Sequence, residues 1–247
     1  SRGQYAMEKL NRGVVSVRSG NNNFVSWRWL GTEDNITFNL YRNGTKVNTT
    51  PLTVTNYTDN GAPANSQYNV KAVVGGVEQA ASETVTTWGQ NYLSVPIQAP
   101  SGSYNANDCS IADVDGDGIY EILLKWDPSN AKDNSQSGVT DNVYIDCYRL
   151  NGTRLWRINL GRNIRAGAHY TQMAFYDFDG DGKAEFMCKT ADATVDGTGK
   201  VIGNANADYR NSGGYILTGP EYLTVFNGVT GAAMATANYV PARGNVG

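Results

Sequence analysis

Two stretches of the sequence, Asp113-Val-Asp-Gly-Asp-Gly-Ile-Tyr-Glu121 and Asp177-Phe-Asp-Gly-Asp-Gly-Lys-Ala-Glu185, repeat one pattern. In both, Asp occupies positions 1, 3 and 5, glycine occupies positions 4 and 6, and Glu occupies position 9. Glycine permits the tight backbone turns that direct several oxygens toward one point. The pattern therefore predicts two equivalent loops, and the sequence around them indicates the fold that carries them.

Alternating carboxylates supply the oxygen ligands that a hard cation such as Ca²⁺ prefers, and the residue at position 7 can add its backbone carbonyl. We therefore expect the chain to bind several Ca²⁺ ions. The predicted ligands are Asp113, Asp115, Asp117, Ile119 and Glu121 in the first loop, and Asp177, Asp179, Asp181, Lys183 and Glu185 in the second.

The two loops differ from the helix–loop–helix calcium hand, which needs a Glu at position 12. Position 12 is Leu124 in the first loop and Cys188 in the second, and both lie in strand-like runs. A solvated acidic turn is the alternative, because Asp-Gly pairs also mark turns. Two copies with matching flanks favour metal loops in a β-structure, and we expect the ions to be structural.

Composition limits the class of protein. Tyr and Gly are abundant, with 15 and 28 of the 247 residues, which favours an all-β chain rich in turns. A formal charge of −3 with scattered Lys and Arg offers no basic stripe for nucleic acid. No run is long and apolar enough to cross a membrane. Metal loops of this kind suit millimolar extracellular calcium, so we expect a secreted protein.

Three cysteines, Cys109, Cys147 and Cys188, lie on strand-like segments. Their odd number argues against a disulfide framework. We expect all three to be small buried hydrophobic residues.

The N-terminal residues 1–92 are predicted to form a small β-sandwich of the immunoglobulin or fibronectin-III type. Residues 24–29 and 68–73 alternate in polarity, and Ile36–Arg42 runs into the hairpin turn Asn43-Gly44. A second turn is expected at Gly75-Gly76. Segment 89–107, rich in Pro, Ser, Asn and Gly, is predicted to be a linker.

Residues 93–247 contain an internal repeat. Asp177 follows Asp113 by 64 residues (177 − 113), and the turn Asn227-Gly228 follows Asn151-Gly152 by 76 (227 − 151). The second unit therefore carries an insertion of 12 residues (76 − 64), which we place within 193–220. Four-strand repeats of this length are typical of β-propeller blades.

Two to two-and-a-half blades cannot close a ring, because propellers have about 4–8 blades. The sequence ends on the polar stretch Pro241–Gly247 rather than on a strand. We therefore expect the chain to be the front part of a larger protein, whose remaining blades lie on the same polypeptide or on a second chain.

Several stretches together resemble the rhamnogalacturonan lyases of polysaccharide lyase family 11. They cover the non-calcium segments as well as the loops, in the same order and spacing along essentially the whole chain. The matching stretches are Met7–Val15, Phe24–Arg28, Leu30–Thr32, Phe38–Arg42, Asn107–Gly118, Tyr120–Pro128, Asn163–Gln172 and Gly219–Phe226.

This resemblance implies an N-terminal fibronectin-III-like domain, an eight-bladed calcium-binding propeller and a specific activity. The family cleaves the rhamnose–galacturonate backbone of rhamnogalacturonan I, a pectin, by β-elimination. The resemblance also implies that Asn107 and Asp127 contact the polysaccharide and that Asp108 is associated with a calcium ion. The family's catalytic base falls outside this sequence, so we assign none here.

Other side chains have a structural and a functional interpretation. For His169, the only histidine, a structural hydrogen bond or a place in the cleft wall is favoured over a role as general base. Lys125 and Arg165 could neutralise a uronate or could be surface or strand-end charges. The aromatic residues Trp126, Trp156 and Tyr170 are expected to pack between blades rather than stack on sugars.

A second class of function has similar loops. Calcium propellers also occur as non-catalytic binding or adhesion modules with much the same Asp and Gly spacing. The stretches Lys125–Pro128 and Arg165–Tyr170 lie outside the loops and match the lyases. These stretches favour the enzyme.

Overall fold

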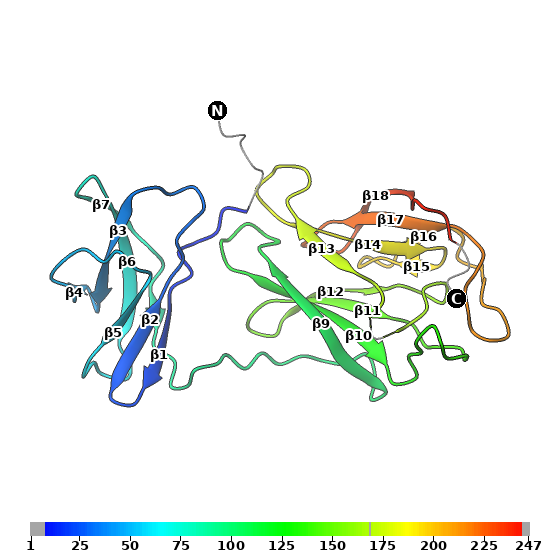
Figure 1. Ribbon diagram of the computed structural model, residues 1–247, viewed down its shortest axis with the longest axis horizontal. Coiled ribbons are helices and arrows are strands. Elements are labelled where there is room, and N and C mark those ends of the chain that lie inside the picture. The colour runs from blue at the N-terminus through cyan, green and yellow to red at the C-terminus, as the bar shows by residue number, and fades with distance from the viewer. Residues whose placement is uncertain (1–7, 168, 244–247) are drawn as a thin grey trace. The chain divides into compact units, whose positions relative to one another are not determined.

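The computed structural model describes residues 8–167 and 169–243. Met7 of the first matching stretch, Ala168 and the C-terminal residues 244–247 lie outside the described part. Every regular element in that part is a β-strand, which confirms the all-β prediction (Figure 1). No helix among the described residues is long and apolar enough to span a membrane. The strands are β1 (Val15–Ser19), β2 (Asn22–Ser26), β3 (Ile36–Arg42), β4 (Thr45–Lys46), β5 (Asn56–Asp59), β6 (Gln67–Val74), β7 (Val77–Ala81), β8 (Val85–Thr86), β9 (Tyr104–Ala112), β10 (Glu121–Pro128), β11 (Tyr144–Tyr148), β12 (Arg154–Asn159), β13 (Met173–Tyr176), β14 (Glu185–Ala191), β15 (Thr194–Val195), β16 (Val201–Ile202), β17 (Glu221–Phe226) and β18 (Ala233–Asn238).

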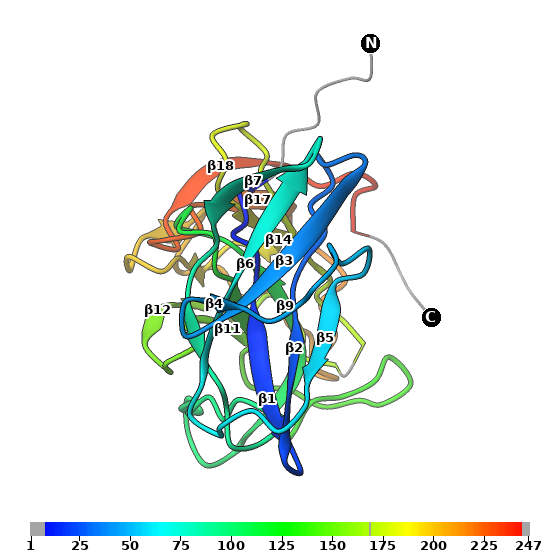
Figure 2. The same cartoon turned by 90° about the vertical axis from the view of Figure 1, so that its left-hand side faces the viewer.

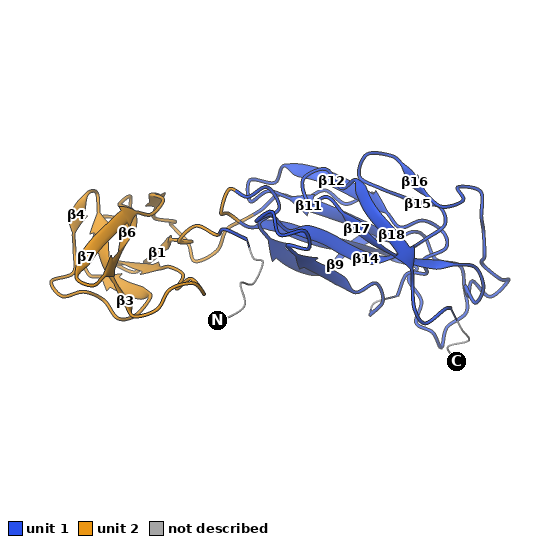
Figure 3. Ribbon diagram, turned by 90° about the horizontal axis from the view of Figure 1, so that it is seen from above, with its two compact units in different colours: residues 1–9, 95–116, 120–247 blue, residues 10–94, 117–119 orange. Residues whose placement is uncertain are grey.

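The chain divides into two compact units (Figure 3). The smaller unit comprises residues 10–94 together with 117–119, and the larger unit comprises residues 1–9, 95–116 and 120–247. Each unit has its own core.

The smaller unit contains two antiparallel sheets (Figure 2). One has the order β1-β2-β5, and the other has the order β4-β3-β6-β7 with β8 paired to β6. The predicted hairpin turn joins β3 to β4, and both Asn43 and Gly44 have positive φ, 48° and 81°. Gly75 and Gly76 likewise have φ of 56° and 82° between β6 and β7. Both turns are confirmed, because such turns require residues that tolerate positive φ.

One core joins the two sheets of the smaller unit. Val25 from β2, Phe38 and Leu40 from β3, and Val70 from β6 are buried in it. Tyr68 is fully buried at its edge and keeps its hydroxyl paired. That hydroxyl donates to Asp59 Oδ2 at 2.7 Å and accepts from Asn23 Nδ2 at 3.0 Å.

Replacing Tyr68 with phenylalanine should lower the free energy of unfolding of this unit by about 1–3 kcal/mol, since buried partners lose a hydrogen bond. Urea denaturation of the variant would measure the change. Tyr92→Phe is the matched control, because Tyr92 is 60% exposed. Equal stabilities of the two variants would show that the Tyr68 hydroxyl contributes nothing.

In the larger unit, each sequence repeat contributes four antiparallel strands. The first repeat gives β9, β10, β11 and β12 in order, and the second gives the sheet β13-β14-β17-β18. The predicted insertion contains the hairpin β15–β16, which does not extend its own repeat. It pairs instead with β12, Val195 lying opposite Asn159, so the first sheet has six strands. The predicted linker 89–107 is too long, because β9 already begins at Tyr104.

The main core of the larger unit lies between the two repeats. Phe186 of β14 stacks against Trp156 of β12 with ring centroids 5.9 Å apart, and against Phe226 of β17 at 5.6 Å. Cys147 and Cys188 are buried in this core, as expected. Cys109 is exposed on the edge strand β9, so its predicted burial is wrong.

Candidate functional site

The two acidic loops share one hydrogen-bond pattern. The amide at position 4 donates to the Asp at position 1, Gly116 to Asp113 at 2.8 Å and Gly180 to Asp177 at 2.7 Å. The Glu at position 9 accepts from the amide at position 2, Val114 to Glu121 at 2.9 Å and Phe178 to Glu185 at 2.8 Å. The glycines at positions 4 and 6 all have φ between 80° and 90°. The repeated sequence therefore builds the same local structure twice.

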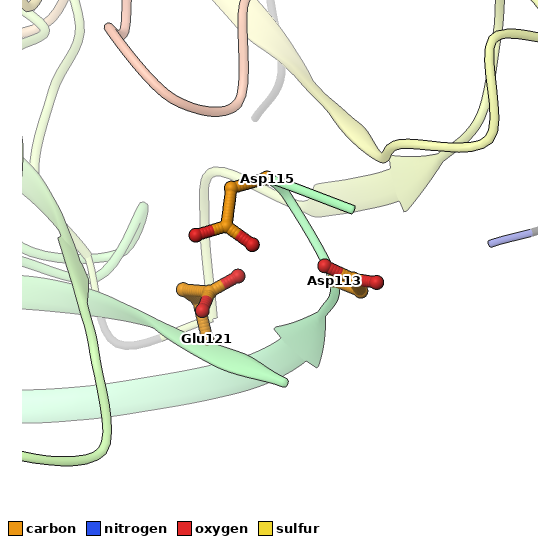
Figure 4. Close-up of side chains that lie close together, drawn as sticks. All are labelled: Asp113, Asp115 and Glu121. Carbon is orange, nitrogen blue, oxygen red and sulfur yellow. The ribbon is translucent and has the colours of Figure 1, made fainter. Parts of the chain in front are cut away.

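Positions 1, 3 and 9 bring carboxylates together in both loops. Asp113, Asp115 and Glu121 lie around a common space (Figure 4), with oxygen atoms from all three within 4.8 Å of one another. Asp177, Asp179 and Glu185 form the same arrangement. These groups could each hold a metal ion.

The residues at positions 5 and 7 interact locally. The Asp at position 5 lies outside each tight group of carboxylates. Asp117 accepts a hydrogen bond from the Ile119 amide at 2.7 Å, and Asp181 accepts one from the Lys183 amide at 2.8 Å. The carboxylate clusters therefore contain three of the predicted side-chain ligands in each loop.

The chemistry of these donors fits a hard cation. Asp113 and Asp177 are 0% and 2% exposed, and Glu121 and Glu185 are also buried. Burial is the largest influence on Glu185 and raises its pKa; Asp179 and Asp181 raise it further, against the lowering effect of the Phe178 amide. Buried carboxylates that repel one another are stabilised when a cation lies between them, and all-oxygen sites suit Ca²⁺ or Mg²⁺ rather than soft metals.

The two loops are directly bonded to each other. The Ala184 amide, between positions 7 and 9 of the second loop, donates to the Asp113 carbonyl at 2.9 Å. Glycine is favoured at position 116 by its φ of +81°, and a Cβ there would approach the Lys183 side chain of the second loop to 3.2 Å. Asp113 of the first loop and Ala184 of the second are therefore neighbours within the larger unit.

A β-bulge lies just before the first loop. In the pairing of β9 with β10, Cys109 is opposite Leu124 and Ala106 is opposite Trp126. Two residues, Asn107 and Asp108, therefore lie opposite the single residue Lys125. Bulges change the direction in which side chains point and are frequent beside functional sites.

Asn107 and Asp127 meet at this bulge. The Asn107 amide Nδ2 donates a short hydrogen bond to Asp127 Oδ2. The other carboxylate oxygen of Asp127, Oδ1, is buried and has no hydrogen-bond partner among the described residues. Burial raises the pKa of Asp127 overall, although Lys125 and the bond from Asn107 lower it. The pair thus combines a partly exposed amide with a buried carboxylate that keeps one oxygen without a partner.

Lys125 lies between the bulge and the segment 163–172, which contains His169. Its side chain is 1% exposed, and its Nζ lies 3.2 Å from Asp108 Oδ2. The same ammonium donates to the Tyr170 carbonyl at 2.7 Å. The interpretation of Lys125 as a surface or strand-end charge is therefore wrong, since it is buried in the middle of β10.

Comparison with known proteins places the chain in a family. Residues 92–247 match the family model described as "Rhamnogalacturonan lyase family 11, C-terminal domain". The chain belongs to rhamnogalacturonan lyase family 11. Residues 5–88 match a second model, "Rhamnogalacturonan I lyases beta-sheet domain".

The curated relatives of this family-11 chain come from Bacillus subtilis (strain 168). Rhamnogalacturonan endolyase YesW is 61% identical over 97% of this chain, and rhamnogalacturonan exolyase YesX is 53% identical over 97%. The crystal structure of YesW superposes with a TM-score of 0.92, covering 97% of this chain and 43% of that one. A Bacillus licheniformis rhamnogalacturonan lyase is 62% identical, with a TM-score of 0.91 over 97% of this chain and 43% of that one. The present chain spans only 40% and 41% of the curated relatives' own lengths.

The remaining candidate residues of the family-11 chain have different environments. Arg165 is half-buried and donates to the carbonyls of Asp133 and Gly138, so it holds the loop that follows β10. His169 is exposed and lines a cavity of about 580 Å³ beside β13, β14 and β17. Neither Asn107 nor Asp127 lines that cavity.

The aromatic candidates are mostly structural. Trp156 stacks in the core between the repeats, which confirms its predicted packing role. Trp126 is buried on the other face of the first sheet and donates to the buried Asp146 at 2.8 Å. Tyr170 is half-buried, and its hydroxyl donates to Asp133 Oδ1 at 3.0 Å. Sequence reasoning missed Asp146, since nothing in its neighbourhood distinguishes it from a solvated charge.

Proposed function

We propose that this chain is the N-terminal portion of an enzyme that cleaves the rhamnose–galacturonate backbone of rhamnogalacturonan I by β-elimination. The proposal is carried by the 61% identity to rhamnogalacturonan endolyase YesW along 97% of the chain. The Asn107–Asp127 pair beside the bulge supports it, because it offers a preformed polar site for a sugar. YesW and YesX are named endolyase and exolyase, so the position of the cut is left open.

We propose that residues 1–92 form a fibronectin-III-like sandwich and that residues 93–247 form the first blades of a propeller. Two sheets around one core in the smaller unit support the first assignment. Two successive four-stranded repeats packed face to face support the second. The remaining blades would come from the same protein or from a second chain, as the coverage of 40% of YesW suggests.

A secreted location is proposed from the acidic loops, since extracellular calcium is plentiful.

β-Elimination removes the proton at C5 of a uronate, which requires a base and neutralisation of the adjacent carboxylate. In this chain Asn107 and Asp127 would contact the sugar hydroxyls. Lys125 and Arg165 already donate to backbone carbonyls, so neither is assigned to the uronate. We assign no base within this sequence.

Bound Ca²⁺ would neutralise the clustered carboxylates and hold the loops in one geometry. We propose the ligands Asp113, Asp115 and Glu121, and Asp177, Asp179 and Glu185, which the structure brings together. The other proposed ligands are Asp108, Asp117, Ile119, Asp181 and Lys183. Asp108 is exposed beside the bulge.

The proposed reaction class is tested by digesting rhamnogalacturonan I in water labelled with heavy oxygen. An elimination breaks the glycosidic bond without adding water, so mass spectrometry should find unsaturated products free of the label. Saturated products that have gained labelled water would identify a hydrolase and contradict the proposal. Homogalacturonan is the control substrate and should give no product.

A further inference from the structure

Lys125 and Lys189 occupy the same position in the two repeats, 64 residues apart (189 − 125). Their environments nevertheless differ. Lys189 is 40% exposed and pairs with Glu221 at 2.6 Å, whereas Lys125 is 1% exposed. A buried ammonium requires compensating partners, and those of Lys125 are Asp108 at the bulge and the Tyr170 carbonyl. The repeat fold alone therefore does not require a buried lysine here.

Tyr170 is held at both ends. Its carbonyl accepts from Lys125, while its hydroxyl accepts from the Asn134 amide at 2.6 Å and donates to Asp133. The next residue, Thr171, has a φ of +62°. This conformation is a genuine outlier for a β-branched residue, and it persists only where the surrounding structure enforces it. The bond from Lys125 to the preceding carbonyl is such a constraint.

The other contacts of Lys125 reach the proposed sugar site. Asp108 follows Asn107 directly, and its amide donates to Asn107 Oδ1 at 2.6 Å. Asn107 in turn donates to Asp127. One buried ammonium therefore lies between the Asn107–Asp127 pair and the strained peptide of the segment 163–172.

We propose that Lys125 is a positioning residue that fixes the strained Tyr170–Thr171 peptide and the Asn107–Asp127 pair in one geometry. This inference rests on the proposed lyase function, because its benefit is correct placement of the polysaccharide. Lys125 itself need not touch the substrate. Small displacements of positioning groups can lower a rate substantially.

The test is a double-mutant cycle in the complete protein that carries this chain. Lys125→Met should lower kcat/KM on rhamnogalacturonan I by about tenfold, and the control Lys189→Met should leave it within about twofold. Thr171→Gly should be close to wild type, since glycine adopts positive φ without strain. The variant Lys125→Met/Thr171→Gly should lose less than Lys125→Met alone, because the peptide no longer needs enforcement. Additive losses, or equal activities of Lys125→Met and Lys189→Met, would overturn the proposal.

Hydrogen exchange provides a readout that does not depend on activity. The Tyr170 amide donates to the Gly167 carbonyl at 3.1 Å, so its exchange reports opening of the segment. Lys125→Met should speed that exchange by about tenfold, and Lys189→Met should not. Faster exchange with unchanged kcat/KM would show a merely structural lysine and overturn the positioning role. A wild-type protein that makes no unsaturated product would contradict the lyase function itself. Unchanged exchange in Lys125→Met would show that Lys125 does not fix the Tyr170–Thr171 peptide.

Discussion

Replacing Asp127 with asparagine should lower the turnover of rhamnogalacturonan I by about 10- to 100-fold, because a charged hydrogen bond to a substrate is worth about 1.5–3 kcal/mol. Asp127 Oδ1 is a buried acceptor without a partner among the described residues. An amide of the same size keeps the volume of the side chain but loses the charge. Initial rates measured on purified variants would give the change.

Two further measurements make the Asp127 prediction specific. The melting temperature should change little, because asparagine keeps the volume of the side chain and its amide oxygen can still accept the hydrogen bond from Asn107. Asp141→Asn is the matched control, since Asp141 is exposed after the same strand and lies outside the proposed site. A rate for Asp127→Asn equal to that of Asp141→Asn would remove Asp127 from the site.

Removing Ca²⁺ should lower the melting temperature of the larger unit by about 5–10 °C. An ion present at 100 times its dissociation constant stabilises the folded state by about 2.7 kcal/mol, and a domain of this size shifts by about 2–4 °C per kcal/mol. The reason is the repulsion among buried carboxylates in each loop. Calorimetry with added Ca²⁺ and with EDTA would measure the shift.

The pH dependence of that shift follows from Glu185. Its pKa is raised in the metal-free protein, chiefly by burial. Protons therefore compete with the ion for the Glu185 carboxylate as the pH falls. The stabilisation by Ca²⁺ should therefore shrink at acidic pH.

Asp177→Asn should remove part of the shift in melting temperature that Ca²⁺ causes, since the Asp177 carboxylate belongs to the second cluster only. A melting temperature that is the same with added Ca²⁺ and with EDTA would contradict metal binding.

Features with a strong local signal could be predicted from the sequence. The alternating Asp and Gly residues define both loops, and their hydrogen bonds match position by position. The Asn43-Gly44 turn and the strand Ile36–Arg42 likewise follow from local preferences. Local geometry depends on few neighbours, which is why these predictions hold.

Features that depend on distant strands could not be predicted. The hairpin β15–β16 joins the sheet of the preceding repeat through Val195 and Asn159, a pairing that no local pattern specifies. Cys109 is exposed because β9 is an edge strand of that sheet. Lys125 is buried opposite a bulge of two residues, and a bulge depends on the register between strands rather than on residue type.

The measurement that tests the central claim most directly is ultraviolet absorbance during incubation with rhamnogalacturonan I. β-Elimination removes the C5 proton and leaves a conjugated unsaturated uronate, which absorbs at about 235 nm. We expect the absorbance to rise with the complete protein that carries this chain, and to stay flat when EDTA is present. No rise in the complete protein with Ca²⁺ bound would contradict the lyase and identify a calcium-binding module without this activity.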